Sequence, residues 1–199
     1  MAMRQFILAS ASPRRQSLLR EAGYEFVVHP AGIDEEVHPA GLTPIELARF
    51  LAEAKANSVA DQFPEDMVLA ADTIVAFGDK VLGKPADALH AREMLELLAG
   101  TTHIVITGLA VACRATNFFR ATHVMSAVRM KMLGGQEIER YVQSGDWQGK
   151  AGGYGIQDCD PFVIRTAGSH SNIVGLPMRA ARELLVAAGI RPTLGVPES

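Results

Sequence analysis

Cysteine is scarce in this sequence. Its 199 residues include only two, Cys113 and Cys159, and their separation does not match the spacing of a metal-binding motif. Free thiols in a reducing cytosol, and hence a cytoplasmic protein, are the simplest interpretation. The six histidines are scattered, without a His-x-x-x-His pair on an expected helix, which argues against a zinc site.

Three further absences narrow the classes of function. The formal net charge is −3, so no basic excess would attract nucleic acid non-specifically. No apolar run reaches the length that spans a membrane. The N-terminal MAMRQFILAS enters a strand-like run without the layout of a signal peptide. We therefore expect neither nucleic acid nor a membrane as a partner.

Apolar patterning and turn residues predict strands that alternate with helices in one domain over residues 1–199, with a loose tail from about 191. The predicted strands are 5–9, 24–29, 68–77, 101–113 with a break at Gly108, 123–132 and 162–166. The predicted helices are 13–22, 43–60, 87–98 with Leu89 in the core, 136–143 and 176–188, and a turn is predicted at 168–172. Because some neighbouring strands look hairpin-connected, the fold class is α/β with a mixed sheet.

One acidic residue, Asp72, lies between two apolar runs, 68–71 and 74–77. A carboxylate in so apolar a strand costs several kcal/mol unless a metal, a cation or hydrogen bonds meet it. Asp72 is therefore either a paired structural group or a functional acid, because ion pairs that only stabilise the fold also occupy such positions.

Arginine occupies the first turn of the first predicted helix, as Arg14 and Arg15, after the predicted N-cap Ser12 and Pro13 at the first helical position. Cations are mildly unfavourable there because the helix dipole is positive at that end. Two arginines beside free backbone N–H groups form an anion site, and the alternative is a pair of solvated arginines.

Three other stretches hold candidate polar groups. The loop Asp34-Glu35-Glu36 is either solvated or a source of oxygen ligands for a hard cation such as Mg²⁺. Lys55, at the edge of a helical apolar stripe, is by itself expected to be a surface lysine. The glycine-rich stretch 149–157 lets backbone N–H groups approach a ligand closely.

Four motifs together resemble the Maf family of nucleoside triphosphate pyrophosphatases: LASASPRRQSLL (8–19), Asp72-Thr73 followed by Gly83-Lys84-Pro85, GKAGGYGIQ (149–157) and GSHSNIVGLP (168–177). The resemblance implies a mixed α/β fold with an elongated central sheet and flanking helices. This fold is similar to that of inosine triphosphate pyrophosphatases, and the resemblance also implies a cleft between two lobes. Such enzymes cleave a nucleoside triphosphate to the monophosphate and pyrophosphate with a divalent ion, Mg²⁺ or Mn²⁺, and are often homodimers.

Matching the motifs residue by residue implies roles for individual side chains. Asp72 matches the catalytic acid, which we expect to act as general base. The implied substrate-binding residues are Ser10, Arg14, Arg15, Lys55 and Lys84. The implied metal ligands are Asp72 with Asp34 or Glu35.

The resemblance extends to the choice of base. Arg14, Thr73 and Gln157 match the residues that mark the dTTP/UTP type, so the expected substrates are dTTP, UTP and modified pyrimidine nucleotides. Two alternatives stay open at this point. One is the same chemistry on 7-methyl-GTP, against which Gln157 counts. The other is a nucleotide-binding regulator of septum formation and cell division with incidental hydrolysis.

Overall fold

The computed structural model describes residues 6–156 and 162–193. Its strands are β1 (Phe6–Leu8), β2 (Phe26–Val28), β3 (Val68–Phe77), β4 (Lys80–Leu82), β5 (Thr102–Cys113), β6 (Phe118–Met130) and β7 (Val163–Ala167). Its helices are α1 (Pro13–Glu21), α2 (Pro44–Gln62), α3 (Ala88–Leu98), α4 (Gly135–Ser144), α5 (His170–Val174) and α6 (Met178–Ala187), and a 3-10 turn, η1, covers Ala151–Gly153.

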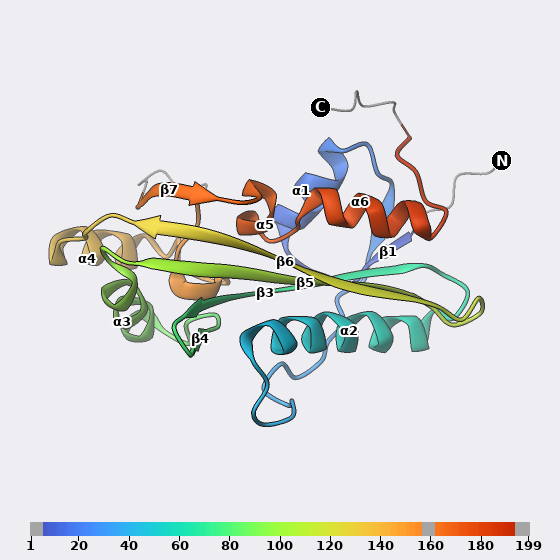
Figure 1. Cartoon of the computed structure of the whole chain (residues 1–199), viewed down its shortest axis with the longest axis horizontal. Coiled ribbons are helices and arrows are strands. Elements are labelled where there is room, and N and C mark those ends of the chain that lie inside the picture. Colours follow the sequence, from blue (N-terminus) through green and yellow to red (C-terminus); the bar gives the residue numbers. More distant parts are fainter. Residues whose placement is uncertain (1–5, 157–161, 194–199) are drawn as a thin grey trace.

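All the strands join one elongated, twisted sheet (Figure 1). Its order is β2-β1-β3-β5-β6-β7, with β4 paired to β3. β1 is parallel to β2 and β3, and the remaining pairs are antiparallel. The prediction of a mixed α/β fold with an elongated sheet and flanking helices is therefore confirmed.

One edge of β3 is shared by two short strands. β1 pairs with its first residues, at Val68 and Leu69, and β4 pairs with its last residues, from Val75 to Phe77. β5 pairs with the opposite edge from Val68 to Ala76. The middle of β3, with Asp72 and Thr73, therefore lies between the end of β1 and the start of the β4 hairpin. The end of a parallel strand beside such a change in the sheet is a common place for a ligand site in α/β folds.

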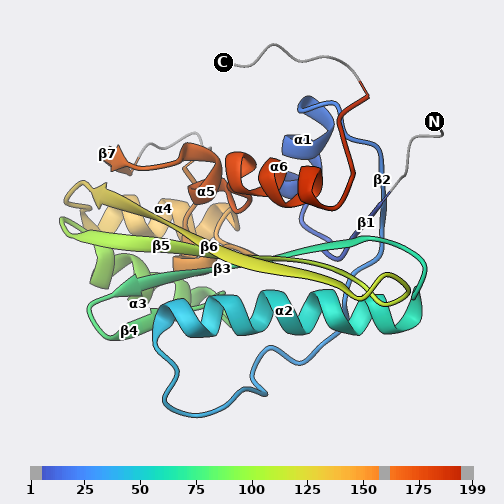
Figure 2. The same ribbon diagram turned by 45° about the vertical axis from the view of Figure 1, so that its right-hand side comes forward.

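Side-chain alternation along β3 sends Asp72 and Thr73 to opposite faces of the sheet. The Asp72 face is covered by α2, which packs against β3 and β5 through two apolar clusters. The Thr73 face carries two separate clusters, one with α1 and α6 and the other with α3 and α4. Figure 2 shows α2 along one side of the sheet and α1 with α6 across the other. The apolar core of the Thr73 face is thus divided in two near Thr73.

α2 begins with a capping box, in which Thr43 and Glu46 exchange side-chain and backbone hydrogen bonds. The helix lies unusually close to the sheet at Gly108, where an added Cβ would come within 2.1 Å of the carbonyl oxygen of Ala48. The predicted break at Gly108 is wrong, because β5 runs unbroken through it. The glycine serves the approach of α2 instead.

Other predictions differ in detail. Leu89, expected in the core, is 65% exposed, because the buried face of α3 is formed by Ala91, Met94, Leu95 and Leu98, and a residue two positions before Ala91 lies on the opposite side of the helix. The predicted turn at 168–172 contains the start of α5, which Ser169 caps by accepting from the N–H of Asn172. β6 begins at Phe118, five residues before the expected start at His123. Within the described residues, no helix is both long and apolar enough to cross a membrane.

Candidate active site

A cavity of about 800 Å³ opens beside the middle of β3. Its walls come from the β1–α1 loop with the first turn of α1, the loop before α2, the middle of β3, Lys84, residues 148–151 and 154–156, and the segment 173–175. Segments from both ends of the chain therefore meet at this cavity. It also lies where the two apolar clusters of the Thr73 face separate, in accord with the predicted cleft between lobes.

The lining of the cavity is strongly cationic. Its described residues include two carboxylates, Glu35 and Asp72, and five cationic side chains, Arg14, Arg15, Lys55, Lys84 and Lys150. The whole chain, in contrast, has a formal net charge of −3. Positive charge gathered in a concave site raises the local concentration of an anionic ligand.

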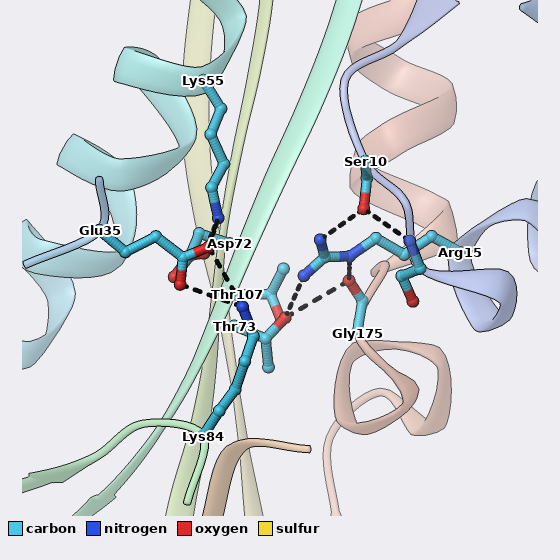
Figure 3. A network of polar contacts seen from close by, with 10 residues as sticks. Ser10, Arg15, Glu35, Lys55, Asp72, Thr73, Lys84, Thr107 and Gly175 are labelled. Atoms are coloured by element: carbon cyan, nitrogen blue, oxygen red, sulfur yellow. Dashed lines mark hydrogen bonds and ion pairs between the residues drawn. The ribbon is translucent and has the colours of Figure 1, made fainter. Parts of the chain in front are cut away.

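On the α2 side of the cavity, four charged groups form a chain of ion pairs (Figure 3). The Lys55 ammonium contacts Oδ1 of Asp72 and lies 2.8 Å from Oε1 of Glu35. Glu35 in turn accepts from Lys84, with Nζ to Oε2 at 3.0 Å. A buried carboxylate, Asp72, is thus met by a buried ammonium, and the second carboxylate links that ammonium to the exposed Lys84.

The burial of Lys55 differs from what its position in α2 alone suggests, which is a surface lysine. Lys55 is only 7% exposed and faces the sheet, so the surface-lysine interpretation is wrong. The resemblance had placed it among the substrate-binding residues, and it does line the cavity.

The two acidic residues of the preceding loop have different surroundings. Glu35 lines the cavity, and although burial raises its pKa, its contacts with Lys55 and Lys84 outweigh burial and lower the pKa overall. Asp34 is exposed and accepts from the backbone N–H of Glu36 at 3.0 Å. Of the two residues that could accompany Asp72, only Glu35 is brought to the cavity.

On the opposite side of β3, the guanidinium of Arg15 is held by three neutral oxygens. It donates to the Gly175 carbonyl at 2.8 Å, to Ser10 Oγ at 2.9 Å and to Thr73 Oγ1 at 3.1 Å. Burial lowers the pKa of Arg15, and the charges of Asp72 and Glu35 act against that effect. A half-buried cation whose hydrogen-bond partners are neutral favours an anionic ligand.

The first turn of α1 adds further donors. Ser12 occupies the N-cap position, but its side chain makes no capping hydrogen bond, and Pro13 is the first helical residue. Uncapped N–H groups at a helix N-terminus attract anions. Arg14 reaches across the cavity mouth to the carbonyl of Gly149 at 3.4 Å. The predicted anion site thus has its arginines and its helix terminus facing one cavity.

The glycine-rich stretch forms the far wall. Tyr154 lines the cavity, and its hydroxyl is 2.6 Å from Nε2 of the buried His103. Burial lowers the pKa of His103 to about 4 and raises that of Tyr154, so both are neutral near pH 7. Gln157, predicted to read the base, lies outside the described residues.

Sequence reasoning missed three contributors: His103, Thr107 and Gly175. Thr107 interrupts the apolar run of β5 as Asp72 interrupts that of β3, and this signal could have identified it. The role of the Gly175 carbonyl, which is a backbone group, has no side-chain signal.

The fold and the cavity define an α/β protein with a cationic site for an anionic ligand, built around an acidic residue in the central sheet. The chain belongs to the Maf family, because the family model described as Maf-like protein matches residues 5–188.

Several similar proteins carry the name "dTTP/UTP pyrophosphatase". The one from Roseobacter denitrificans is 46% identical over 188 residues, which cover 94% of this chain and 98% of the relative. The one from Cereibacter sphaeroides is 47% identical over 186 residues, covering 92% and 95%. Among solved structures, a nucleoside-triphosphatase described as a dITP/XTP pyrophosphatase from Mycobacterium abscessus aligns with a TM-score of 0.43 and 14% identity, over 71% of this chain and 95% of that one.

Proposed function

We propose that the protein is a nucleoside triphosphate pyrophosphatase that hydrolyses dTTP and UTP to the monophosphate and pyrophosphate. The observation that carries this proposal is the cavity's lining of five cations and two carboxylates. A triphosphate brings about four negative charges near neutral pH, and these must be neutralised before a nucleophile can approach. The names of relatives that align over nearly the full chain support the pyrimidine substrates.

The phosphates are assigned to the α1 side of the cavity. Arg15 is already oriented by Ser10, Thr73 and Gly175, so little side-chain entropy is lost when it meets a phosphate. Arg14 and the N–H groups of the first turn add to this site, and Lys84 faces it from the β4 hairpin.

Asp72 is assigned the role of general base. It takes a proton from a water molecule while the water oxygen forms a bond to the α-phosphorus. The bond between that phosphorus and the bridging oxygen breaks, and pyrophosphate leaves with the electron pair. Lys55 contacts Oδ1 of Asp72, which leaves Oδ2 as the oxygen assigned to the proton.

A divalent cation, Mg²⁺ or Mn²⁺, is part of this proposal. Within the described residues no group of three or more His, Cys, Asp or Glu side chains could hold a metal. The donors present still fit Mg²⁺, which is usually bound by one or two carboxylates together with substrate phosphates. Asp72 and Glu35, which share Lys55 as a partner, are the assigned ligands, and the ion would neutralise phosphate charge.

Choice of the pyrimidine base is assigned to Arg14, Thr73 and Gln157. Gln157 offers both a donor and an acceptor, which match the edge of thymine or uracil. The homodimer, the cytoplasmic location, the single domain over 1–199 and the absence of nucleic-acid and membrane partners stay predictions.

The test is pyrophosphate release from a panel of nucleoside triphosphates with Mg²⁺, using the wild type and Asp72→Asn. We expect turnover of dTTP and UTP above purine nucleotides and 7-methyl-GTP. Loss of a general base lowers turnover by about 10²- to 10⁴-fold, so Asp72→Asn should fall by that amount.

Circular dichroism and thermal unfolding establish that the variant is folded. Near-wild-type turnover by folded Asp72→Asn would remove the general-base assignment. Binding of dTTP by the wild type without hydrolysis of any triphosphate would favour the regulatory alternative.

A further inference from the structure

The polar contacts behind Arg15 continue into the sheet. Thr107 is a fully buried residue of β5 and pairs in register with Thr73 of β3. Its neighbours on the same face, Val105 and Leu109, belong to the two separate apolar clusters. Thr107 therefore places a hydroxyl group in the apolar interior, directly behind Thr73, which contacts Arg15 (Figure 3).

The hydroxyl protons of the two threonines can be assigned from their distances. Thr107 Oγ1 is 3.2 Å from the Asn172 carbonyl and 2.9 Å from Thr73 Oγ1. Thr73 Oγ1 is 3.4 Å from the Gly175 carbonyl, which already accepts from Arg15 at 2.8 Å. The shorter contacts favour a chain in which Thr107 donates to Asn172 and Thr73 donates to Thr107.

This chain fixes what Thr73 can offer to the cavity. A hydroxyl has one proton, and Thr73 donates it within the protein, to Thr107 Oγ1 or to the Gly175 carbonyl. One of the two lone pairs on the same oxygen accepts from Arg15 at 3.1 Å. Thr73 thus has no proton left to donate to a substrate.

Thr107 is itself held in place by α5. Asn172 is fully buried, and its backbone carbonyl accepts from Thr107. Its side-chain N–H groups donate to the Val105 carbonyl and to Ser126 Oγ. The backbone carbonyl of Asn172, the last acceptor in this series of hydrogen bonds, is therefore held against β5 and β6, which makes the orientation of the two hydroxyls rigid.

We propose that Thr107 is a positioning residue which, through the Thr73 hydroxyl, orients the Arg15 guanidinium toward the phosphates of the substrate. Through its hydroxyl, Thr73 then acts on the phosphate side of the site by way of Arg15. This inference rests on the proposed function only in taking the anionic ligand to be a polyphosphate.

The test measures the affinity of the protein for inorganic tripolyphosphate, which has no base, by titration calorimetry. Thr107→Val keeps the shape of the side chain and removes the hydroxyl. A misdirected hydrogen bond to a charged group corresponds to about a tenfold loss of affinity, which we expect for Thr107→Val and for Thr73→Val. The double variant should bind no more weakly than Thr73→Val alone, because Thr107 acts through Thr73.

Two further variants separate positioning from a general loss of stability. Thr107→Ser keeps the hydroxyl and should restore affinity to within about threefold of the wild type. Thr101→Val is a matched control, because Thr101 also donates its hydroxyl to a backbone carbonyl, but that carbonyl, Leu98 at 2.8 Å, is not one of the groups hydrogen-bonded around Arg15. It should bind tripolyphosphate as the wild type does.

Several outcomes would overturn the proposal: wild-type affinity in folded Thr107→Val, additive losses in the double variant, or no binding of tripolyphosphate by the wild type. If Thr107→Val does not fold, Thr73→Val still decides, since unchanged tripolyphosphate affinity in that variant would mean that Thr73 does not act through Arg15. Turnover of dTTP is assayed separately. A wild type that binds tripolyphosphate with the expected pattern but hydrolyses nothing would refute the proposed function and leave this inference standing.

Discussion

Replacing Lys55 by methionine tests whether the buried ion pair is a coupled unit. Methionine keeps an unbranched side chain of similar length and removes the ammonium. Asp72, which is 5% exposed, would then be buried without the cation that contacts it, while Glu35 would keep Lys84. Breaking a buried ion pair by removing one partner costs about 3–5 kcal/mol of unfolding free energy, and we expect Lys55→Met to lie in that range.

The matching change, Asp72→Asn, should cost less, about 1–3 kcal/mol, because Lys55 keeps its second carboxylate, Glu35, at 2.8 Å. In the double variant neither buried charge is left alone. The sum of the two single-variant costs should therefore exceed the cost of the double variant by about 2 kcal/mol.

Urea unfolding measures these free energies, followed by the fluorescence of Trp147, which is the only tryptophan and is buried. Circular dichroism at the same urea concentrations checks that unfolding is two-state. Single costs that add to the cost of the double variant within about 0.5 kcal/mol would refute the coupling, because independent sites behave in that way.

Two further predictions concern the sheet. Gly108→Ala should lower the unfolding free energy by about 1–3 kcal/mol, because its Cβ would meet the Ala48 carbonyl at 2.1 Å, whereas the control Gly135→Ala, with nothing within 4 Å, should change it little. Equal urea midpoints for these two variants would contradict the close approach of α2. For His103, burial lowers the pKa from 6.5 to about 4, so the unfolded chain binds a proton that the folded chain does not between these values. Stability should be highest above pH 6.5 and fall by up to about 3 kcal/mol toward pH 4, and His103→Phe should show a flatter profile over the same pH series.

The parts of the fold that are local in sequence could be predicted. The capping box of α2 and the proline at the start of α1 gave the beginnings of both helices, because a helix start depends on residues within one turn. β3 followed from its two apolar runs, 68–71 and 74–77.

The buried face of α2 could not be predicted in the same way. Alanines on several sides of this helix leave its apolar stripe poorly defined, so Lys55 looked like a surface residue. The face is decided by the sheet, which accepts the helix closely only where Gly108 removes a side chain. Lys55 belongs to the face that packs on the sheet, and Gly108, which allows the close approach, is more than fifty residues away from it in the sequence.

The hydrogen bonds around Arg15 could also be predicted only in part from the sequence. The two arginines in the first turn of α1 predicted an anion site from a local rule, since cations oppose the helix dipole there. Of the three acceptors that orient Arg15, only Ser10 is close in sequence; the other two are Thr73 on β3 and Gly175, which is 160 positions further along the chain. Such contacts exist only after the strands have paired, so a single sequence cannot specify them.

The strand geometry of β3 explains how two adjacent residues, Asp72 and Thr73, serve opposite sides of the site. Successive residues of a strand face opposite sides, so Asp72 meets Lys55 on the α2 face and Thr73 meets Arg15 on the other. The cavity reaches both side chains because neither β1 nor β4 pairs with the middle of this edge in the described part of the chain. A slip of one residue in the pairing of β3 with β5 would exchange the two faces and place the carboxylate among the hydroxyls beside Arg15. The long register with β5, from Val68 to Ala76, therefore secures the fold and also keeps Asp72 and Arg15 on separate sides of the site.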